Sequence, residues 1–232
     1  MAKKQYFAIV DTETTITDKV ADFGIIICDR NGNIYSQCAV LIKDIFGVDS
    51  LFFNRDAKDI WSIASVARRM ENYNNMLNTG TRMAASVNAI NSWIAKAVIK
   101  YNPELTAYNL AFDKSKCDNT GINLGLFTKE FCLWGAAVGN ICNTRKYREF
   151  VIQNHLFNNR TEYGNMTYST TAEAVTGFLS GNMTDEPHTS LEDIIGYELP
   201  TLVHILKKKD WRKKSIAYNW RSHQVKDYFG VK

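Results

Sequence analysis

The sequence is poor in cysteine and has no apolar run long enough to cross a bilayer. Its 232 residues include five cysteines, and no two of them form a C-x-x-C pair. An odd count without such a pair argues against a disulfide framework and against a structural zinc site. We therefore expect mostly buried thiols in a reducing compartment. The start, MAKKQYFAIVDTE, has too few apolar residues for a signal peptide, so we expect a cytoplasmic protein without a membrane partner.

Internal repeats, low-complexity tracts and clear linkers are also lacking. With 45% hydrophobic and 22% charged residues, the composition suits one globular domain spanning 1–232. Residues 140–182, rich in Asn, Thr, Tyr and Arg, are expected to be a variable insertion or the outer wall of a site, and residues 207–232 a basic tail. The net charge of +4 favours an anionic partner only weakly.

The hydrophobic pattern predicts an α/β fold that begins with a hairpin. Asn31-Gly32 is a tight-turn signal between two apolar runs. The expected strands are 6–10, 23–28, 34–42, 105–108 and 130–134. The expected helical regions are 57–101, 147–157, 171–179 and 187–209, the last with a kink or restart near Pro200.

The first apolar strand ends in two carboxylates, Asp11 and Glu13, in the stretch YFAIVDTETT. Side chains alternate along a strand, so both face one side with Cα atoms about 6.6 Å apart. Carboxylates this close repel each other unless a cation lies between them, and oxygen ligands suit Mg²⁺ or Mn²⁺. The alternative is a strand end that carries two solvated acids.

Two later stretches place polar residues at strand and helix ends. In LTAYNLAFDKS, a short strand leads to Asn109, Phe112 and Asp113, although Asn and Asp are also common helix caps. In EPHTSLEDIIG, His188 and Asp193 are five residues apart, which on an α-helix leaves them about 140° apart. Both can reach one site if the helix starts at the rim of that site.

The order D-x-E, N-x-x-F-D and H-x4-D resembles the DEDDh 3′–5′ exonuclease family, over about residues 5 to 208. The matching residues are Asp11, Glu13, Asp113, His188 and Asp193. The resemblance implies an RNase H-like fold, with a mixed five-stranded sheet whose first three strands are antiparallel and which is flanked by helices. Glu192 beside Asp193 matches an acidic doublet that is common in the family.

The resemblance also implies a mechanism with two ions, Mg²⁺ or Mn²⁺. Asp11 would bridge the ions, Glu13 and Asp193 would hold the nucleophile-side ion, Asp113 would hold the other, and His188 would be the general base. The expected activity is hydrolysis of single-stranded nucleic acid from its 3′ end, with DNA favoured over RNA, to nucleoside 5′-monophosphates. Family members are often dimers or polymerase subunits, so a polymerase or a second copy of the chain is the expected protein partner.

Three further residues are candidate substrate contacts by the same resemblance: Thr14 at the terminal 3′-OH, and Asn109 and Phe112 at the terminal base. Core packing is the alternative for Phe112. One position departs from the family pattern, because Ile16 stands where a glycine is usual, which puts the local turn in doubt.

Basic residues gather in KKKDWRKK, residues 207–214, around Trp211, and again at Arg145, Lys146 and Arg148. These residues could hold a single strand, but a solvated helix end is the favoured interpretation of the first run.

Two other functions remain open. One is a module that grips nucleic-acid 3′ ends or a polymerase without cleaving. The other is an endonuclease or integrase of the same broad fold, which clusters acids similarly without needing the H-x4-D pair.

Overall fold

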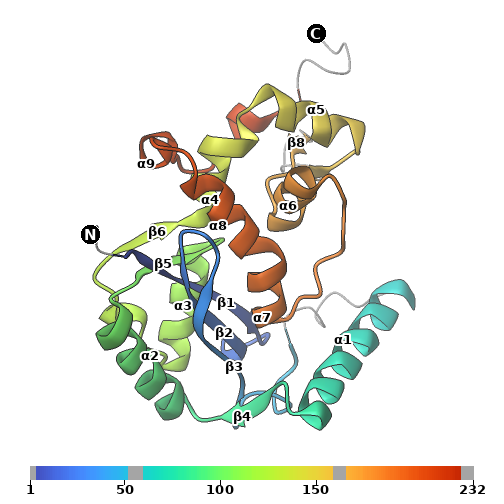
Figure 1. The fold of residues 1–232 in the computed structure, drawn as a ribbon. Coiled ribbons are helices and arrows are strands. Elements are labelled where there is room, and N and C mark those ends of the chain that lie inside the picture. Colours follow the sequence, from blue (N-terminus) through green and yellow to red (C-terminus); the bar gives the residue numbers. More distant parts are fainter. Residues whose placement is uncertain (1–3, 52–59, 159–165, 226–232) are drawn as a thin grey trace.

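A mixed sheet of six strands forms the centre of the computed structural model, which describes residues 4–51, 60–158 and 166–225 (Figure 1). The strand order is β4-β3-β2-β1-β5-β6. β1 to β3 are antiparallel, and β4, β5 and β6 each run parallel to the strand they join. The strands are β1 (Tyr6–Thr14), β2 (Val20–Asp29), β3 (Ile34–Ile42), β4 (Met83–Ala85), β5 (Glu104–Ala107) and β6 (Glu130–Cys132).

The expected five-stranded sheet is therefore wrong by one strand, although the α/β class and the antiparallel hairpin are confirmed. The additional strand is β4, which lies inside the region that we predicted to be helical, 57–101. β4 has only three residues and pairs with β3 alone, so it is too short to show an alternating pattern. β1 also continues to Thr14, so Asp11 and Glu13 lie within the strand and not after it.

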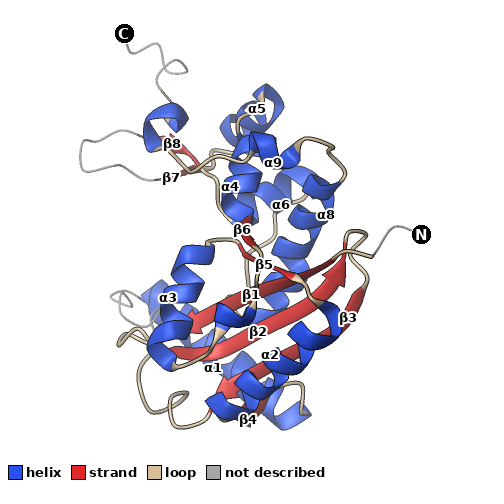
Figure 2. Cartoon of the chain, turned by 90° about the vertical axis from the view of Figure 1, so that its left-hand side faces the viewer, coloured by secondary structure: helices blue, strands red, loops and turns tan. Residues whose placement is uncertain are grey.

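Helices cover both faces of this sheet and extend beyond it (Figure 2). The helices are α1 (Ile60–Thr79), α2 (Val87–Tyr101), α3 (Leu110–Thr120), α4 (Leu133–Ala137), α5 (Arg145–Gln153), α6 (Ala172–Ser180), α7 (Ser190–Asp193), α8 (Leu199–Leu206) and α9 (Trp211–Lys214). Shorter elements are the 3₁₀ turns Leu124–Leu126 and Trp220–His223, the π turns Val138–Cys142 and Ile194–Glu198, and the hairpin of β7 (Phe157–Asn158) and β8 (Thr167–Tyr168).

Alternation along β1 divides the core into two layers. Phe7 and Ile9 face the cluster that includes residues of α4 to α8, whereas Ala8 and Val10 face the cluster under α2 and α3. Asp11 and Glu13 continue the row of Phe7 and Ile9, so they point toward the face that α7 and α8 cover. All five cysteines are free thiols and three of them are buried, in agreement with the expectation from the sequence.

The basic run 207–214 is fastened to the body of the protein. Trp211 is buried and its ring lies 4.8 Å from that of Phe131, centroid to centroid. Both terminal nitrogens of Arg212 donate to the carboxylate of Glu104, at 2.8 and 2.6 Å. Trp211 is therefore a core side chain and does not offer a face for base stacking. Within the described residues, no helix is long and apolar enough to span a bilayer.

The helix α7 approaches β2 closely at Gly24. A Cβ at this position would lie 2.8 Å from the Ser190 carbonyl carbon and 2.9 Å from the Leu191 nitrogen. Gly24 pairs with Asp11 across the β1–β2 ladder. The missing side chain thus lets the start of α7 rest directly beside the acidic end of β1.

A buried ion pair holds the same helix in place. Asp22, with no exposed surface, accepts from Arg82 Nε at 3.2 Å, from the Ser190 amide at 3.0 Å and from the Tyr73 hydroxyl at 3.2 Å. Arg82 Nη2 also donates to Glu192 at 2.6 Å. Burial raises the pKa of Asp22, and the charge of Arg82 and hydrogen bonds from Ser190 oppose that rise.

We expect Arg82→Met to destabilise the protein by about 3–5 kcal/mol, because it leaves the Asp22 carboxylate buried without a partner. The measurement is the free energy of unfolding in urea. The control is Arg145→Met, since the Arg145 side chain is 91% exposed in its pair with Glu149 and its loss should cost at most about 1 kcal/mol. Equal losses in the two variants would contradict the structural role of Asp22.

Candidate active site

Three of the residues predicted from the sequence place potential metal-ligand atoms close together near the C-terminal end of β1. One ligand atom each from Glu13, His188 and Asp193 lies within 4.8 Å of the other two. Glu13 comes from β1, His188 from the loop before α7, and Asp193 from the last position of α7. Residues far apart in the sequence thus form a group that could hold a metal ion.

The two remaining predicted acids lie beside this group. Asp113, in the first turn of α3, is buried and accepts the Thr12 hydroxyl at 2.9 Å. Burial, then the charge of Glu198 and then those of Asp113, Glu13 and Asp193 raise the pKa of Asp11, so Asp11 lies near all four acids. In the described part of the chain, Asp11 and Asp113 belong to no second three-ligand group.

Burial is the main reason why these carboxyl groups favour their protonated forms. It raises the pKa of Glu13 to about 8 and that of Asp113 to about 7. Burial and then the charge of Glu186 raise the pKa of Asp193 to about 9. One Asp193 oxygen, Oδ1, is buried without a hydrogen-bond partner. Crowded carboxylates with an unused oxygen fit a divalent cation such as Mg²⁺ or Mn²⁺.

His188 has an unusual backbone conformation. Its φ of 54° lies in the left-handed region, which costs a residue with a side chain about 1 kcal/mol or more. The Tyr73 hydroxyl shares its proton between Asp22 and the His188 carbonyl, which lies 3.4 Å away, and this contact helps to hold the turn. Burial, and then the charge of Arg69, lower the pKa of His188 to about 4. The imidazole is therefore neutral near pH 7 and has a lone pair for a proton or a metal ion.

The candidate substrate contacts lie in different surroundings. Thr14 is buried at the end of β1. Asn109 occupies the N-cap position of α3 but makes no side-chain cap bond, and it lines a cleft with Asp11. Phe112 is 42% exposed with Lys116 Nζ 4.9 Å from its ring, so core packing is excluded for it.

The turn that follows β1 tolerates Ile16 without strain. The residue with positive φ there is Asp18, at 65°, and not Ile16. The Ile16 amide donates to the Ser50 carbonyl at 2.9 Å, and its side chain is 48% exposed. Ile16 therefore does not distort this turn.

Two adjoining clefts open onto the site. One, of about 320 Å³, is lined by Asp11, Asn109, Glu186 and Glu198, among others. The second, of about 410 Å³, is lined by Arg68, Arg69, Asn72, Glu173, Asp185, Glu186, Pro187 and His188. Glu186 lines both, so the clefts meet there.

Sequence reasoning missed Glu186, Glu198 and Arg69. Glu198 is buried, and of the charges that raise the pKa of Asp11 its own has the largest effect. Burial is the main cause that raises the pKa of Glu186 to about 7. None of the three follows from the fixed spacings of the sequence pattern.

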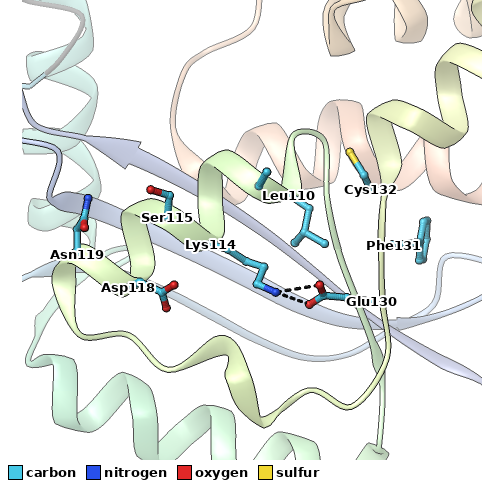
Figure 3. Close-up of a pocket in the computed structure, with 9 residues that line it drawn as sticks. Leu110, Lys114, Ser115, Asp118, Asn119, Glu130, Phe131 and Cys132 are labelled. Carbon is cyan, nitrogen blue, oxygen red and sulfur yellow. Dashed lines mark hydrogen bonds and ion pairs between the residues drawn. The ribbon is translucent and has the colours of Figure 1, made fainter. Parts of the chain in front are cut away.

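A further cleft, of about 670 Å³, lies between α3 and β6 (Figure 3). Lys114 and Glu130 form an ion pair across it, with Nζ 2.8 and 2.7 Å from the two carboxylate oxygens. None of the predicted catalytic residues lines this cleft.

Comparison with known proteins adds no family assignment. The chain matches no family model, and no curated protein matches it with significance. The case for function therefore depends on the geometry of the site.

We expect the metal-free protein to lose stability as the pH rises from about 6.5 to 8.5. The pKa values of Glu13, about 8, and Asp193, about 9, exceed the ordinary values of about 4 in the unfolded chain. The folded protein therefore holds protons that the unfolded chain has released, and its free energy of unfolding falls as pH rises. His188, with its lowered pKa, has the opposite effect only below about pH 6.5.

The melting temperature in EDTA, measured across this window, checks the expectation. A change of 1 kcal/mol corresponds to about 2–4 °C for a chain of this size. Glu13→Gln with Asp193→Asn should flatten the profile, whereas Glu149→Gln, which removes a carboxylate from α5, should not. A melting temperature that stays constant or rises in the wild type would refute crowding of the carboxyl groups.

Proposed function

We propose that the chain is a metal-dependent 3′–5′ exonuclease of the DEDDh type with an RNase H-like fold. It hydrolyses single-stranded nucleic acid, DNA in preference to RNA, to nucleoside 5′-monophosphates. The observation that carries the proposal is the gathering of Glu13, His188 and Asp193 within 4.8 Å of one another, next to Asp11 and Asp113. All five residues of the sequence pattern therefore lie close together, beside the C-terminal end of β1.

The acids would hold two divalent ions, Mg²⁺ or Mn²⁺, that stabilise negative charge on a phosphodiester and activate water. Glu13 and Asp193 would hold the nucleophile-side ion, Asp113 the other, and Asp11 would contact both. His188, neutral near pH 7, accepts the proton of the attacking water on a ring nitrogen. Thr14 and Asn109 would position the terminal nucleotide, with Phe112 at the entrance.

Two arginines on α1 favour a phosphate-containing substrate, in a cleft that three acids also line. Arg68, Arg69 and Asn72 on α1 line the 410 Å³ cleft together with His188. Guanidinium groups present paired donors that match phosphate oxygens. The positive charge of Arg69 acts on Glu13 and Glu186 as well as on His188, so this arginine faces the acidic group.

The test uses matched DNA and RNA oligonucleotides labelled at the 5′ end, incubated with the protein in Mg²⁺, Mn²⁺ or EDTA. We expect a ladder that shortens from the 3′ end, faster on DNA, and no products in EDTA. Asp113→Asn should lower the rate by at least about a hundredfold, because a lost metal ligand weakens charge stabilisation in the transition state. Glu149→Gln should cleave like the wild type.

Other results would favour the alternatives. Binding of single strands without cleavage would point to a module that only grips 3′ ends. Internal cuts would point to an endonuclease or integrase. Either result would refute the exonuclease.

His188→Gln tests whether this residue is the base or a metal ligand. One of its ring nitrogens lies within 4.8 Å of a carboxylate oxygen of Glu13 and of Asp193, so either role is geometrically open. As the base, His188 should be dispensable for metal binding, while its loss lowers the rate about 10²–10⁴-fold. Mn²⁺ titration by calorimetry and single-turnover cleavage separate these effects. A parallel loss of Mn²⁺ affinity and rate would make His188 a ligand instead.

A further inference from the structure

Two carboxylates that line the acidic cleft, Glu186 and Glu198, lie outside the five-residue pattern. Glu198 is 3% exposed and lines the 320 Å³ cleft with Asp11. Its Oε1 accepts the Tyr108 amide at 3.1 Å, just after β5. Its other oxygen, Oε2, is buried and has no hydrogen-bond partner. A buried carboxylate oxygen without a partner costs free energy, so we expect a cation or a hydrogen-bond donor to bind Oε2.

A π turn explains why Glu198 faces the site. Residues five apart on an α-helix point about 140° away from each other, so Asp193 and Glu198 would diverge. Here Ile194–Glu198 is π-helical, and the Leu199 amide donates to the Ile194 carbonyl five residues earlier. Such a turn brings residues five apart onto the same side. Pro200, in the first turn of α8, has no N–H to donate back to Gly196, which favours this irregularity.

The surroundings of Glu198 are acidic. The charges of Asp113, Glu186 and Asp193 all act on it, and Glu198 in turn acts on Asp11. None of the described contacts places a cationic side chain on Glu198, and the Tyr108 amide satisfies only one of its two oxygens. A cation from solution is the partner that this arrangement lacks.

We propose that Glu198 is a fifth carboxylate of the metal site and binds, together with Asp11, a divalent cation in this cleft. Glu13 and Asp193 would hold the neighbouring ion, beside His188. This inference rests on the proposed function, because it assigns an additional ligand to the same metal centre. It also gives the Tyr108 amide a positioning role, since that bond fixes which oxygen of Glu198 points into the cleft.

The test compares the wild type with Glu198→Gln by calorimetric titration with Mn²⁺, and by the electron paramagnetic resonance of bound Mn²⁺. Glutamine keeps an acceptor for the Tyr108 amide but loses the charge. We expect the loss of one of two bound ions, or binding weakened about tenfold or more. Glu198→Asp, which keeps the charge on a shorter side chain, should recover part of the affinity, and Glu149→Gln should bind like the wild type.

The alternative role for Glu198 is a permanently protonated group that only caps the Tyr108 amide. Glu198→Gln would then bind Mn²⁺ with wild-type stoichiometry and affinity, and this result would overturn the inference while leaving the exonuclease untouched. Failure of the wild type to bind Mn²⁺ would overturn both. Melting curves in EDTA establish that each variant is folded, and Glu198→Gln should melt at or above the wild-type temperature because it removes a repelling charge.

Discussion

A carboxylate with no exposed surface, Asp22, connects the sheet to the elements that carry the site. It lies on β2 opposite Glu13 and accepts hydrogen bonds from Arg82, Tyr73 and the first amide of α7. Leaving a buried charge without partners costs far more free energy than losing any single surface contact. Arg82, Tyr73 and the start of α7 therefore keep their positions around Asp22 together. The position of α7, and with it those of His188 and Asp193, therefore depends on Asp22.

The protein pairs Asp22 with Arg82, whereas one oxygen of Asp193 has no hydrogen-bond partner. The doublet at the end of α7 shows the contrast: Glu192 accepts from Arg82 at 2.6 Å, whereas Asp193 keeps an oxygen without a partner. Two adjacent acids thus serve different purposes, because Glu192 holds the helix and Asp193 faces Glu13 and His188. A fold that pairs one acid so fully can tolerate the repulsion of the others, and that repulsion would favour binding of the proposed divalent cations.

The sequence predicted the parts of this structure that depend on local pattern. The hairpin of β2 and β3 and the helices around 147–157 and 171–179 follow from periodicity and turn residues. The β4 strand was missed because three residues show no period, and β1 was ended too early because acids were taken as the end of a strand. Asp22 and Arg82 were missed because a long-range pair leaves no local signal. Motif spacing found Glu13, His188 and Asp193, which the fold brings together, but it could not show that Phe112 would be exposed.

Glu198 shows where spacing arguments fail for a physical reason. An α-helical projection turns it away from Asp193, and only a π turn reverses that result. Pro200 favours this π turn, but proline is common at the start of a helix and therefore seldom predicts a π turn. A residue placed by irregular backbone is thus invisible to a motif defined by fixed intervals, although it can contribute as much charge as any member of that motif. The charge of Glu198 raises the pKa of Asp11. Carboxylates from β1, α3, α7 and the π turn therefore all contribute to the negative charge around Asp11.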